Sequence, residues 1–431
     1  MTSLTVIGLQ WGDEGKGKIV DIAAAEADAI VRFQGGNNAG HTVMHGNAVF
    51  KLSQLPSGIL RPGKQAIIGN GVVLDPEGLE SEIESLRRAD VEISPDTLAI
   101  ASNACLILPL HRELDALRER LSGAARIGTT GKGIGPAYED KIGRRAIRVG
   151  DLDQPDRLTA MVDRLLDHHN CLRTGMNVET VPRDALLATL GRYRSILAPY
   201  GAAADERIHA IAAGGGRILL EGAQGSLLDI DHGTYPFVTS SSTVAGSAAA
   251  GVGLGPGLLG TVLGVCKAYT TRVGEGPFPT EQDNADGAWL CERGKEFGTV
   301  TGRKRRCGWL DLVMLRATCR LSGVDGLALM KLDVLDGLKE IRLCTGYGPG
   351  DEEAEVLAIG QRMMAPVEPV YEVLPGWSES TEGARKRSDL PAAARHYLDR
   401  IEEITETPIW CLSTSPQRMN LIRCRDEGFF R

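Results

Sequence analysis

The sequence predicts an α/β fold: a large, mostly parallel central sheet with helices on both faces, and a P-loop-like nucleotide-binding core with long insertions. Three observations support this prediction: short runs that are apolar throughout, helix-like stretches between those runs, and a glycine-rich loop directly after the first run. A parallel strand is covered by helices on both faces, so both of its faces must be apolar. Because the 431 residues contain no Pro-rich spacer or internal repeat, we expect a single domain over residues 1–431.

The predicted strands alternate with predicted helices along the chain. Strands are expected at Leu4–Leu9, Ala29–Phe33, Ala66–Gly69, Leu98–Ala101, Arg217–Glu221, Gly326–Leu332 and Ile409–Leu412. Helices are expected, among other places, at Ile19–Ala27, Pro76–Arg88, His111–Leu121, Asp156–His169, Leu310–Leu321 and Ala392–Ile404. In a sheet of this kind ligands bind at the carboxyl ends of the strands, which directs attention to the loop after each strand.

Composition argues against several function classes. The net charge of −8 argues against a general nucleic-acid or membrane-surface binder, so any anion site must be made locally. The nine cysteines include no CxxC pair, which favours the reduced, buried thiols of a cytoplasmic protein over a zinc site or a disulfide framework. The N-terminus lacks the pattern of a signal peptide. Residues 233–266 carry no formal charge, but their glycines and prolines disfavour a spanning helix, so turns around a short helix and a strand are expected.

The loop after the first strand, GLQWGDEGKGKIV, is close to a phosphate-binding loop. Gly12 and Gly17 are separated by four residues and Lys18 follows, but Ile19 stands where a P-loop has the Ser or Thr that binds magnesium. The preceding strand and the following helix favour phosphate binding. Asp13 inside the loop is the unusual residue. It either ligates magnesium or takes a proton from a substrate, or it simply caps the helix.

Two further loops combine glycines with polar side chains. Residues 34–42, QGGNNAGHT, follow the second strand, and His41 is either a general acid or a hydrogen-bonded structural histidine. His41 and His45 also have HxxxH spacing, but Gly40 and Gly46 disfavour the helix that a zinc site of this kind needs. Residues 127–145 hold closely spaced glycines with basic flanks, which suits either a phosphate clamp or a flexible surface loop.

Three loops in the second half of the chain complete the candidate site. Residues 221–243 offer many hydrogen-bonding side chains after a buried strand. The four consecutive cations of Arg303–Arg306 form either an anion site or a solvated charge run. Lys331 and Asp333 lie at the end of the predicted strand Gly326–Leu332. A carboxylate there can accept both donors on the edge of guanine, but Met330 replaces the Asn of the N-K-x-D motif, and a solvated strand end is equally consistent.

Together these loops resemble the adenylosuccinate synthetase family, nearly from end to end. The matching motifs are WGDEGKGK (Trp11–Lys18), QGGNNAGHT (Gln34–Thr42), IGNGVV (Ile68–Val73), GTTGKGIGPAYEDK (Gly128–Lys141), EGAQGSLLDIDHGTYPFVTSS (Glu221–Ser241), KAYTTRVGEGPFPTE (Lys267–Glu281), TGRKRRCGWLD (Thr301–Asp311), KLDVLDGLKE (Lys331–Glu340) and PGWSE (Pro375–Glu379). The resemblance implies GTP-dependent ligation of IMP and L-aspartate to adenylosuccinate, GDP and phosphate through a 6-phosphoryl-IMP intermediate. This is the first committed step from IMP to AMP. It further implies one Mg²⁺ per subunit and a cytoplasmic homodimer.

The resemblance also assigns catalytic roles. Asp13 would remove the N1 proton of IMP and ligate magnesium together with the carbonyl of Gly40, so a hydroxyl at Ile19 is not needed. His41 would be the general acid that supports charge transfer to O6 of IMP and to the leaving diphosphate. Arg144 matches an arginine that reaches across a dimer to the partner's IMP.

Substrate contacts follow from the same resemblance. The residues expected to contact IMP are Asp13, Glu14, Gly15, Lys16, Asn38, Ala39, Gly40, His41, Thr130, Arg144, Gln224, Thr239 and Arg303. Those expected to contact aspartate are Thr299, Val300, Thr301, Gly302, Arg303, Lys304 and Arg305. Those expected to contact GTP are Gly12, Asp13, Glu14, Gly15, Lys16, Gly17, Lys18, Gly40, His41, Thr42, Arg305, Lys331, Leu332, Asp333, Ser413, Thr414 and Ser415.

Three positions depart from the usual family pattern, and two other functions are considered. Ser415 stands where glycine is common, and Lys132 and Lys304 stand where arginine is common, so nucleotide affinity is the property open to change. A regulatory GTPase would use water as the acceptor, and a nucleotide-binding protein would show no turnover. The acid inside the phosphate loop and the missing hydroxyl argue against the first. The retained Asp13, His41 and Arg303 argue against the second.

Overall fold

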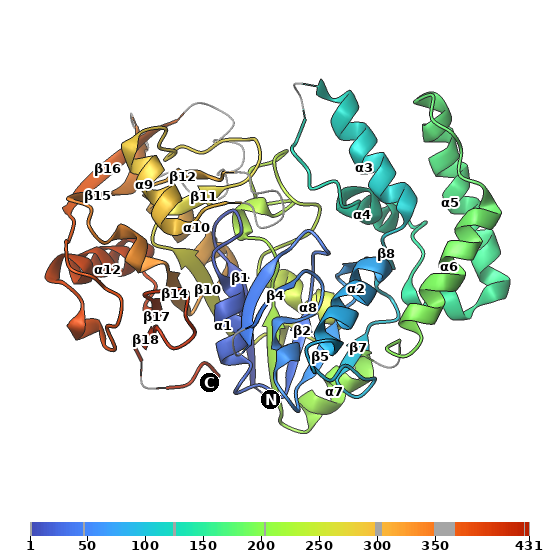
Figure 1. Ribbon diagram of the computed structural model, residues 1–431, viewed down its shortest axis with the longest axis horizontal. Helices are drawn as coiled ribbons and strands as arrows, with labels where there is room; N and C mark the ends of the chain where they lie inside the picture. Colours follow the sequence, from blue (N-terminus) through green and yellow to red (C-terminus); the bar gives the residue numbers. More distant parts are fainter. Residues whose placement is uncertain are drawn as a thin grey trace. The chain divides into compact units, whose positions relative to one another are not determined.

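The computed structural model describes residues 2–45, 48–123, 126–201, 204–297, 304–348, 367–425 and 427–430, with the backbone alone for residues 42–45 and 48–49. Its largest sheet has nine strands: β1 (Thr2–Gly8), β2 (Ala29–Arg32), β5 (Gln65–Ile68), β7 (Leu98–Ile100), β9 (Arg217–Glu221), β10 (Thr261–Lys267), β14 (Gly326–Met330), β17 (Ile409–Ser413) and β18 (Leu421–Arg423). Their order is β18-β17-β14-β10-β1-β9-β2-β5-β7 (Figure 1).

The sheet is mostly parallel, which confirms the predicted fold class. β1, β10, β14 and β17 pair in parallel, as do β9, β2, β5 and β7, whereas β18 runs antiparallel to β17. Each predicted apolar run overlaps one of these strands. All residues of β2, β10, β14 and β17 are buried, as expected for strands with covered faces.

The chain divides into two compact units. The first unit consists of Met1–Thr2, Ala24–Glu221 and Ser247–Leu258, and the second of Ser3–Ala23, Gly222–Gly246 and Leu259–Arg431. The predicted substrate residues are distributed over both units. That residues 1–431 act as one domain stays a prediction.

In the first unit, proline begins several helices. The helices are α2 (Pro76–Arg87), α3 (Pro109–Leu121), α4 (Ile134–Ile142), α5 (Pro155–Gly175), α6 (Arg183–Leu197) and α7 (Ala204–Ala213), with the 3₁₀ helices η1 (Ser57–Leu60), η3 (Val149–Asp153) and η5 (Pro256–Leu258). Proline in the first turn of α2, α3 and α5 loses no helix hydrogen bond, because that turn has no acceptor for its N–H. Short strands form two further pairs, β3 (His41–His45) with β4 (Ala48–Leu52) and β6 (Val73–Leu74) with β8 (Cys105–Leu106).

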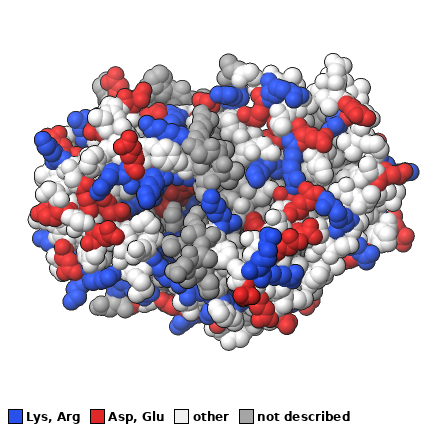
Figure 2. All heavy atoms as spheres, viewed as in Figure 1, with Lys and Arg blue, Asp and Glu red and all other residues white. Residues whose placement is uncertain are grey.

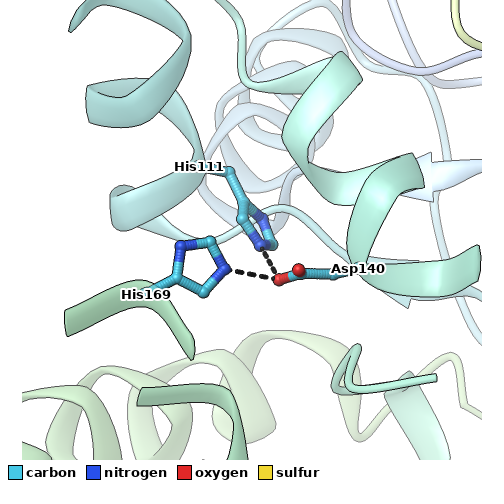
Figure 3. Close-up of side chains that lie close together, drawn as sticks. All are labelled: His111, Asp140 and His169. Atoms are coloured by element: carbon cyan, nitrogen blue, oxygen red, sulfur yellow. Dashed lines mark hydrogen bonds and ion pairs between the residues drawn. The ribbon is translucent and has the colours of Figure 1, made fainter. Parts of the chain in front are cut away.

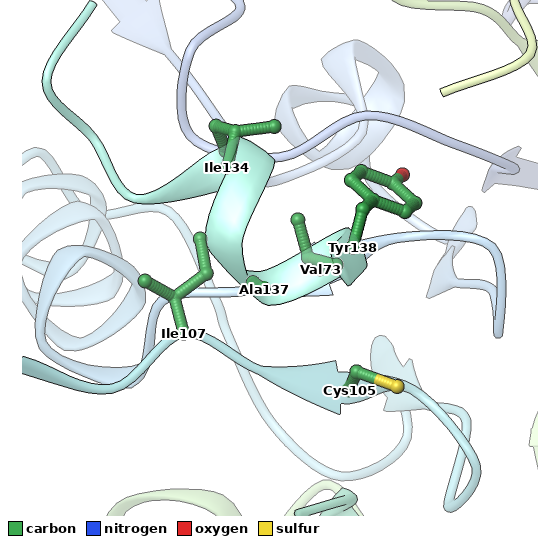
Figure 4. Packing of buried hydrophobic residues seen from close by; sticks show 6 residues of the cluster. All are labelled: Val73, Cys105, Ile107, Ile134, Ala137 and Tyr138. Carbon is green, nitrogen blue, oxygen red and sulfur yellow. The ribbon is translucent and has the colours of Figure 1, made fainter. Parts of the chain in front are cut away.

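A small apolar cluster places α4 against the loop at residues 34–42. Its members are Val73, Cys105, Ile107, Ile134, Ala137 and Tyr138 (Figure 4). A Cβ on Gly36 would lie 2.6 Å from Ile134 Cδ1 and 2.9 Å from the Val73 carbonyl oxygen. Because a larger residue would displace the helix, Gly36 is required for this close packing.

In the second unit, helices connect the other strands of the large sheet. They are α1 (Lys16–Ala23), α9 (Ala285–Gly294), α10 (Leu312–Ser322) and α12 (Ala392–Thr405), with the 3₁₀ helices η4 (Ser226–Leu228), η6 (Leu332–Leu335) and η8 (Arg387–Asp389). Two smaller sheets join β11 (Thr270–Arg272) to β12 (Arg306–Gly308), and β13 (Leu310–Asp311) to β15 (Glu340–Gly348) and β16 (Glu368–Pro375). Helix α10 begins two residues later than predicted, because the Asp311 carboxylate accepts the N–H of Met314 at 3.0 Å and caps it.

The uncharged segment at residues 233–266 forms a short helix and a strand, as predicted. The helix is α8 (Gly246–Val252), and β10 follows it. Within the described part of the chain, no helix combines the length and apolarity that a membrane crossing needs. All nine cysteines are free and seven are buried, which confirms the expected thiols. Basic and acidic side chains are interspersed on the face drawn in Figure 2.

Candidate functional site

The loop after β1 folds around the carboxylate of Glu14. This side chain is fully buried, and its Oε1 accepts the backbone N–H groups of Gln10 and Gly12 at 3.1 and 2.9 Å. Its Oε2 accepts the ammonium of Lys16 at 2.6 Å. A buried carboxylate must be paired and hydrogen-bonded, and these three donors satisfy it. One of the two acids in the loop is therefore a structural group that faces inward.

The loop after β9 packs directly on this turn. Lys16 Nζ donates to the Gln224 carbonyl at 2.5 Å, across 208 positions of the sequence. A Cβ on Gly225 would lie 2.2 Å from the Gln10 carbonyl oxygen and 2.4 Å from Glu14 Oε1. Only glycine permits this approach, so Glu14 and Lys16 hold two of the predicted loops together.

Asp13 is exposed where its neighbour Glu14 is buried. Its backbone is left-handed, with φ of 58°, and its side chain is 36% exposed. Arg305 Nε lies 2.9 Å from Asp13 Oδ2 and forms an ion pair with it. Burial of Arg305 opposes its charge, but Asp13 and Glu296 outweigh that effect and raise the pKa of Arg305. The structure thus brings together two residues that were predicted on separate grounds.

A second buried carboxylate, Glu296, collects three cations. Glu296 Oε1 accepts Lys267 Nζ at 2.8 Å and Lys331 Nζ at 2.6 Å, and Oε2 accepts Arg305 at 2.7 Å. Burial works against the charge of Glu296, but Lys267 and Lys331 hold its pKa well below the usual range. Two residues predicted to contact GTP, Lys331 and Arg305, are therefore positioned by one carboxylate.

The predicted strand Gly326–Leu332 is too long by two residues. β14 ends at Met330 because Lys331 adopts φ of 62°, which turns the chain into η6. Lys331 Nζ also donates to the Gly294 carbonyl at 2.7 Å. Within η6, Leu332 is buried, and burial raises the pKa of Asp333.

The loop between β17 and β18 contacts the helix that follows the phosphate loop. Lys18 Nζ lies 2.8 Å from Ser413 Oγ and 2.9 Å from the Ser415 carbonyl oxygen. Ser413, Thr414 and Ser415 are all buried. The structure thus brings together Lys18 and the three residues predicted for the guanine base.

In the first unit, His41 is held by Glu221 at the end of β9. His41 Nδ1 is hydrogen-bonded to Glu221 Oε1 and lies 3.1 Å from Ser57 Oγ. Glu221 is fully buried and accepts both the N–H and the hydroxyl of Ser57, at 2.8 and 2.7 Å. Burial works against the charge of Glu221, but His41 lowers the pKa of Glu221. The carboxylate thus fixes the proton of His41 on Nδ1 and orients the ring.

Tyr138 on α4 joins two predicted loops of the first unit. Its hydroxyl accepts the N–H of Gly35 at 3.0 Å and donates to the Gly71 carbonyl at 2.7 Å. Thr130, just before α4, is exposed, as are Gly40 and Arg144. Arg144 has φ of 57° at the end of α4. Asn38 and Ala39 are half-buried.

Some predicted residues cannot be placed. Thr299, Val300, Thr301, Gly302 and Arg303 lie outside the described residues, and Thr42 is described by its backbone alone. Of the predicted aspartate loop, the exposed Lys304 and the half-buried Arg305 are described. In the second unit, Thr239 donates its N–H to the Leu228 carbonyl at 2.9 Å.

Comparison with known proteins shows the family of the chain. The model of the family described as adenylosuccinate synthetase matches residues 5–422. The chain belongs to the adenylosuccinate synthetase family. It is similar to the solved, fully ligated adenylosuccinate synthetase from Plasmodium falciparum, with a TM-score of 0.89 and 37% identity over 98% of this chain and 99% of that chain.

A second similar structure shows the fold alone. It is the succinoaminodeoxyadenylate synthetase of cyanophage S-2L bound to dGMP and dATP, with a TM-score of 0.64 and 20% identity over 98% of this chain and 95% of that chain. As a member of the adenylosuccinate synthetase family, the chain is a GTP-dependent ligase that joins IMP and L-aspartate to give adenylosuccinate, GDP and phosphate.

Sequence reasoning missed the acidic partners of this synthetase site. Glu221 was singled out only as the start of a loop, and Glu296 not at all. No local spacing links Glu221 to His41, which lies 180 positions away. A weak signal was available, because an acidic residue at the end of an apolar strand is unlikely to be unpaired.

Within the described residues, the synthetase chain also has one buried His–Asp–His group. His111 on α3 and His169 on α5 both point their Nε2 at Asp140 Oδ2 on α4, at 2.8 and 2.7 Å (Figure 3). His111 Nδ1 accepts the N–H of Leu108 at 3.0 Å, so the proton of a neutral ring is on Nε2. A metal would need that lone pair, which argues against a metal site here. The group ties three helices together instead.

The Asp140→Asn variant is expected to lose about 3 kcal/mol of unfolding free energy, because it removes the charge from a buried, paired carboxylate. Burial works against the charge of Asp140, but the hydrogen bonds from His111 and His169 hold its pKa well below the usual range. Urea unfolding measures the change. Asp167→Asn, at an exposed position on α5, is the matched control and should change stability by under about 0.5 kcal/mol. Equal stability of the two variants would contradict the assignment.

Proposed function

We propose that this ligase works through 6-phosphoryl-IMP, with Asp13 as the base and His41 as the acid. The observation that carries the proposal is that Asp13 alone of the two acids in the phosphate loop is exposed, while Glu14 is consumed internally. Asp13 takes the N1 proton of IMP, and the electron pair moves to O6. O6 then attacks the γ-phosphorus of GTP and the bond to GDP breaks. Finally the aspartate amine attacks C6 and loses one proton, and the C6–O6 bond breaks to release phosphate, which takes up that proton.

We propose His41 as the acid that supports charge on O6 and on the leaving diphosphate. The proposal is supported by the buried Glu221 carboxylate, which holds the ring by Nδ1 and so orients it. A histidine oriented by a buried carboxylate is the arrangement that acid–base catalysis uses repeatedly.

Asp13 and the Gly40 carbonyl would hold one Mg²⁺. Both donors are oxygens, which is the ligand type that magnesium prefers. Asp13 is partly exposed and already faces a cation, and Gly40 is exposed. The donor types of both residues therefore suit the ion. When bound, it supplies positive charge to the phosphate oxygens.

We also propose the substrate contacts implied by the family motifs. IMP would lie on the Asn38–His41 loop, Thr130, Gln224, Thr239 and Arg303. GTP would lie on the phosphate loop, with its base at Lys331–Asp333 and Ser413–Ser415, and aspartate on Thr299–Arg305. The support is the grouping of Arg305 and Lys331 on one carboxylate and the position of the other loops after β1, β2, β9, β14 and β17, whereas Thr130 and Thr299–Arg305 follow helices. The compartment we propose is the cytoplasm.

The deciding experiment follows the oxygen of IMP. Purified protein is incubated with Mg²⁺, GTP, aspartate and IMP labelled with ¹⁸O at position 6, and each component is omitted in turn. Transfer of the label to phosphate, only in the complete mixture, is expected, because O6 leaves C6 as part of the phosphate. Unlabelled phosphate, or GTP hydrolysis without IMP, would exclude the proposed intermediate.

Asp13→Asn is expected to fold and to lose about 10³-fold or more in kcat, since the base can no longer accept the N1 proton. The rate of adenylosuccinate formation measures the loss, and circular dichroism checks the fold. The matched control is Asp283→Asn, which changes an exposed aspartate of the same unit. A folded Asp13→Asn protein with wild-type activity would disprove the mechanism.

We propose a homodimer in which Arg144 reaches the partner's IMP. Its support is the exposed, left-handed position of Arg144 at the end of α4. Asp13→Asn and Arg144→Leu chains are each expected to be inactive. Mixed one to one with subunit exchange, they should recover about a quarter of wild-type activity, because half of the dimers then hold one intact site of two. No recovery in verified mixed dimers would place Arg144 in its own subunit's site.

A further inference from the structure

The ammonium of Lys18 is fully used by one loop. A lysine has three N–H donors. Lys18 Nζ lies 2.8 Å from Ser413 Oγ, 2.9 Å from the Ser415 carbonyl oxygen and 3.1 Å from the Asn420 carbonyl oxygen. All three distances are normal for hydrogen bonds, so no donor is left over. The P-loop formula assigns this lysine to phosphate, but its donors already serve residues between β17 and β18.

The loop at residues 413–420 is also braced internally and attached to α1 at a second point. Ser413 Oγ donates to the Ser415 carbonyl at 3.0 Å, and Asn420 Nδ2 donates to Ser415 Oγ at 2.8 Å. Arg418 Nε pairs with Asp21 Oδ2 on α1 at 2.5 Å. Lys18 and Asp21 are three residues apart on α1 and so share a helix face. The loop at residues 413–420 therefore packs against this face of α1.

We propose that Lys18 is a positioning residue for the nucleotide base and not a phosphate ligand. It fixes the backbone of Ser413–Ser415, and through that backbone it sets the preference for guanine over other purines. The inference rests on the proposed assignment of Ser413–Ser415 to the guanine base.

Charge around Lys18 agrees with this role. Burial lowers the pKa of Lys18 to about 8, while the negative charge of Asp333 acts in the opposite direction. The charge of Asp333, which is also proposed to bind guanine, therefore acts on the ammonium of Lys18. A partly buried ammonium needs hydrogen-bond acceptors close by, and the loop at residues 413–420 provides three of them.

The two roles of Lys18 differ in what they do to different nucleotides. A phosphate ligand acts equally on GTP, ITP and ATP, because their triphosphates are identical. A residue that positions the base-binding loop acts most on GTP, whose 2-amino group ITP and ATP lack. The ratio of kcat/KM for GTP to that for ITP therefore separates the roles, whatever the absolute activity.

The test compares wild type with Lys18→Met, Lys18→Arg and the control Lys339→Met, which changes an exposed lysine. Lys18→Met is expected to lower the GTP-to-ITP ratio by about tenfold, mostly through the KM for GTP. Lys18→Arg is expected to lower it similarly, because a planar guanidinium cannot place three donors where an ammonium does. Amide hydrogen exchange of residues 409–425 should speed up in both variants and not in the control.

An equal loss with all three nucleotides, or full recovery of GTP activity in Lys18→Arg, would overturn the inference and restore Lys18 as a phosphate ligand. Unchanged hydrogen exchange would also overturn it. A wild-type enzyme that does not distinguish GTP from ITP and ATP would instead disprove the proposed guanine assignment, on which the inference depends.

Discussion

The carboxylate of Glu14 is the group on which the phosphate loop depends. Its Oε1 accepts the N–H groups of Gln10 and Gly12 and so fixes the inner side of the turn. It also neutralises Lys16, which in turn holds the Gln224 carbonyl. With the interior of the turn filled in this way, the neighbouring Asp13 faces outward with a left-handed backbone.

The same principle recurs in both units. The chain carries a net charge of −8, but it concentrates cations around its candidate site by placing buried carboxylates beneath them. Glu296 holds Lys267, Lys331 and Arg305, and Glu221 holds His41. A buried carboxylate without a partner would cost much free energy, so each one holds its cations in a fixed orientation. The cations are therefore oriented before any ligand binds.

Much of the fold could be predicted from the sequence, because strands buried on both faces are apolar throughout. The exceptions have physical reasons. β18 is short and partly exposed, so Leu421–Arg423 carries no apolar run. The strand predicted at Gly326–Leu332 ends early because of the positive φ of Lys331, which no pattern in the sequence indicates. The glycine-rich loops indicate where backbone could approach a ligand, and those sites stay predictions. The acids that orient Lys331 and His41 could not be found, since their pairing is made only by the tertiary fold.

The tight packing around Glu14 has an evolutionary consequence. A Cβ on Gly8 would lie 2.5 Å from Glu14 Oε2, and one on Gly225 would lie 2.4 Å from Glu14 Oε1. Loss of Glu14 would leave the buried ammonium of Lys16 without its carboxylate partner. Loss of either glycine would displace the Glu14 side chain. A change at Glu14, Gly8 or Gly225 alone would therefore destabilise the turn. We expect the loop to evolve toward an ordinary P-loop only if several of these positions change together.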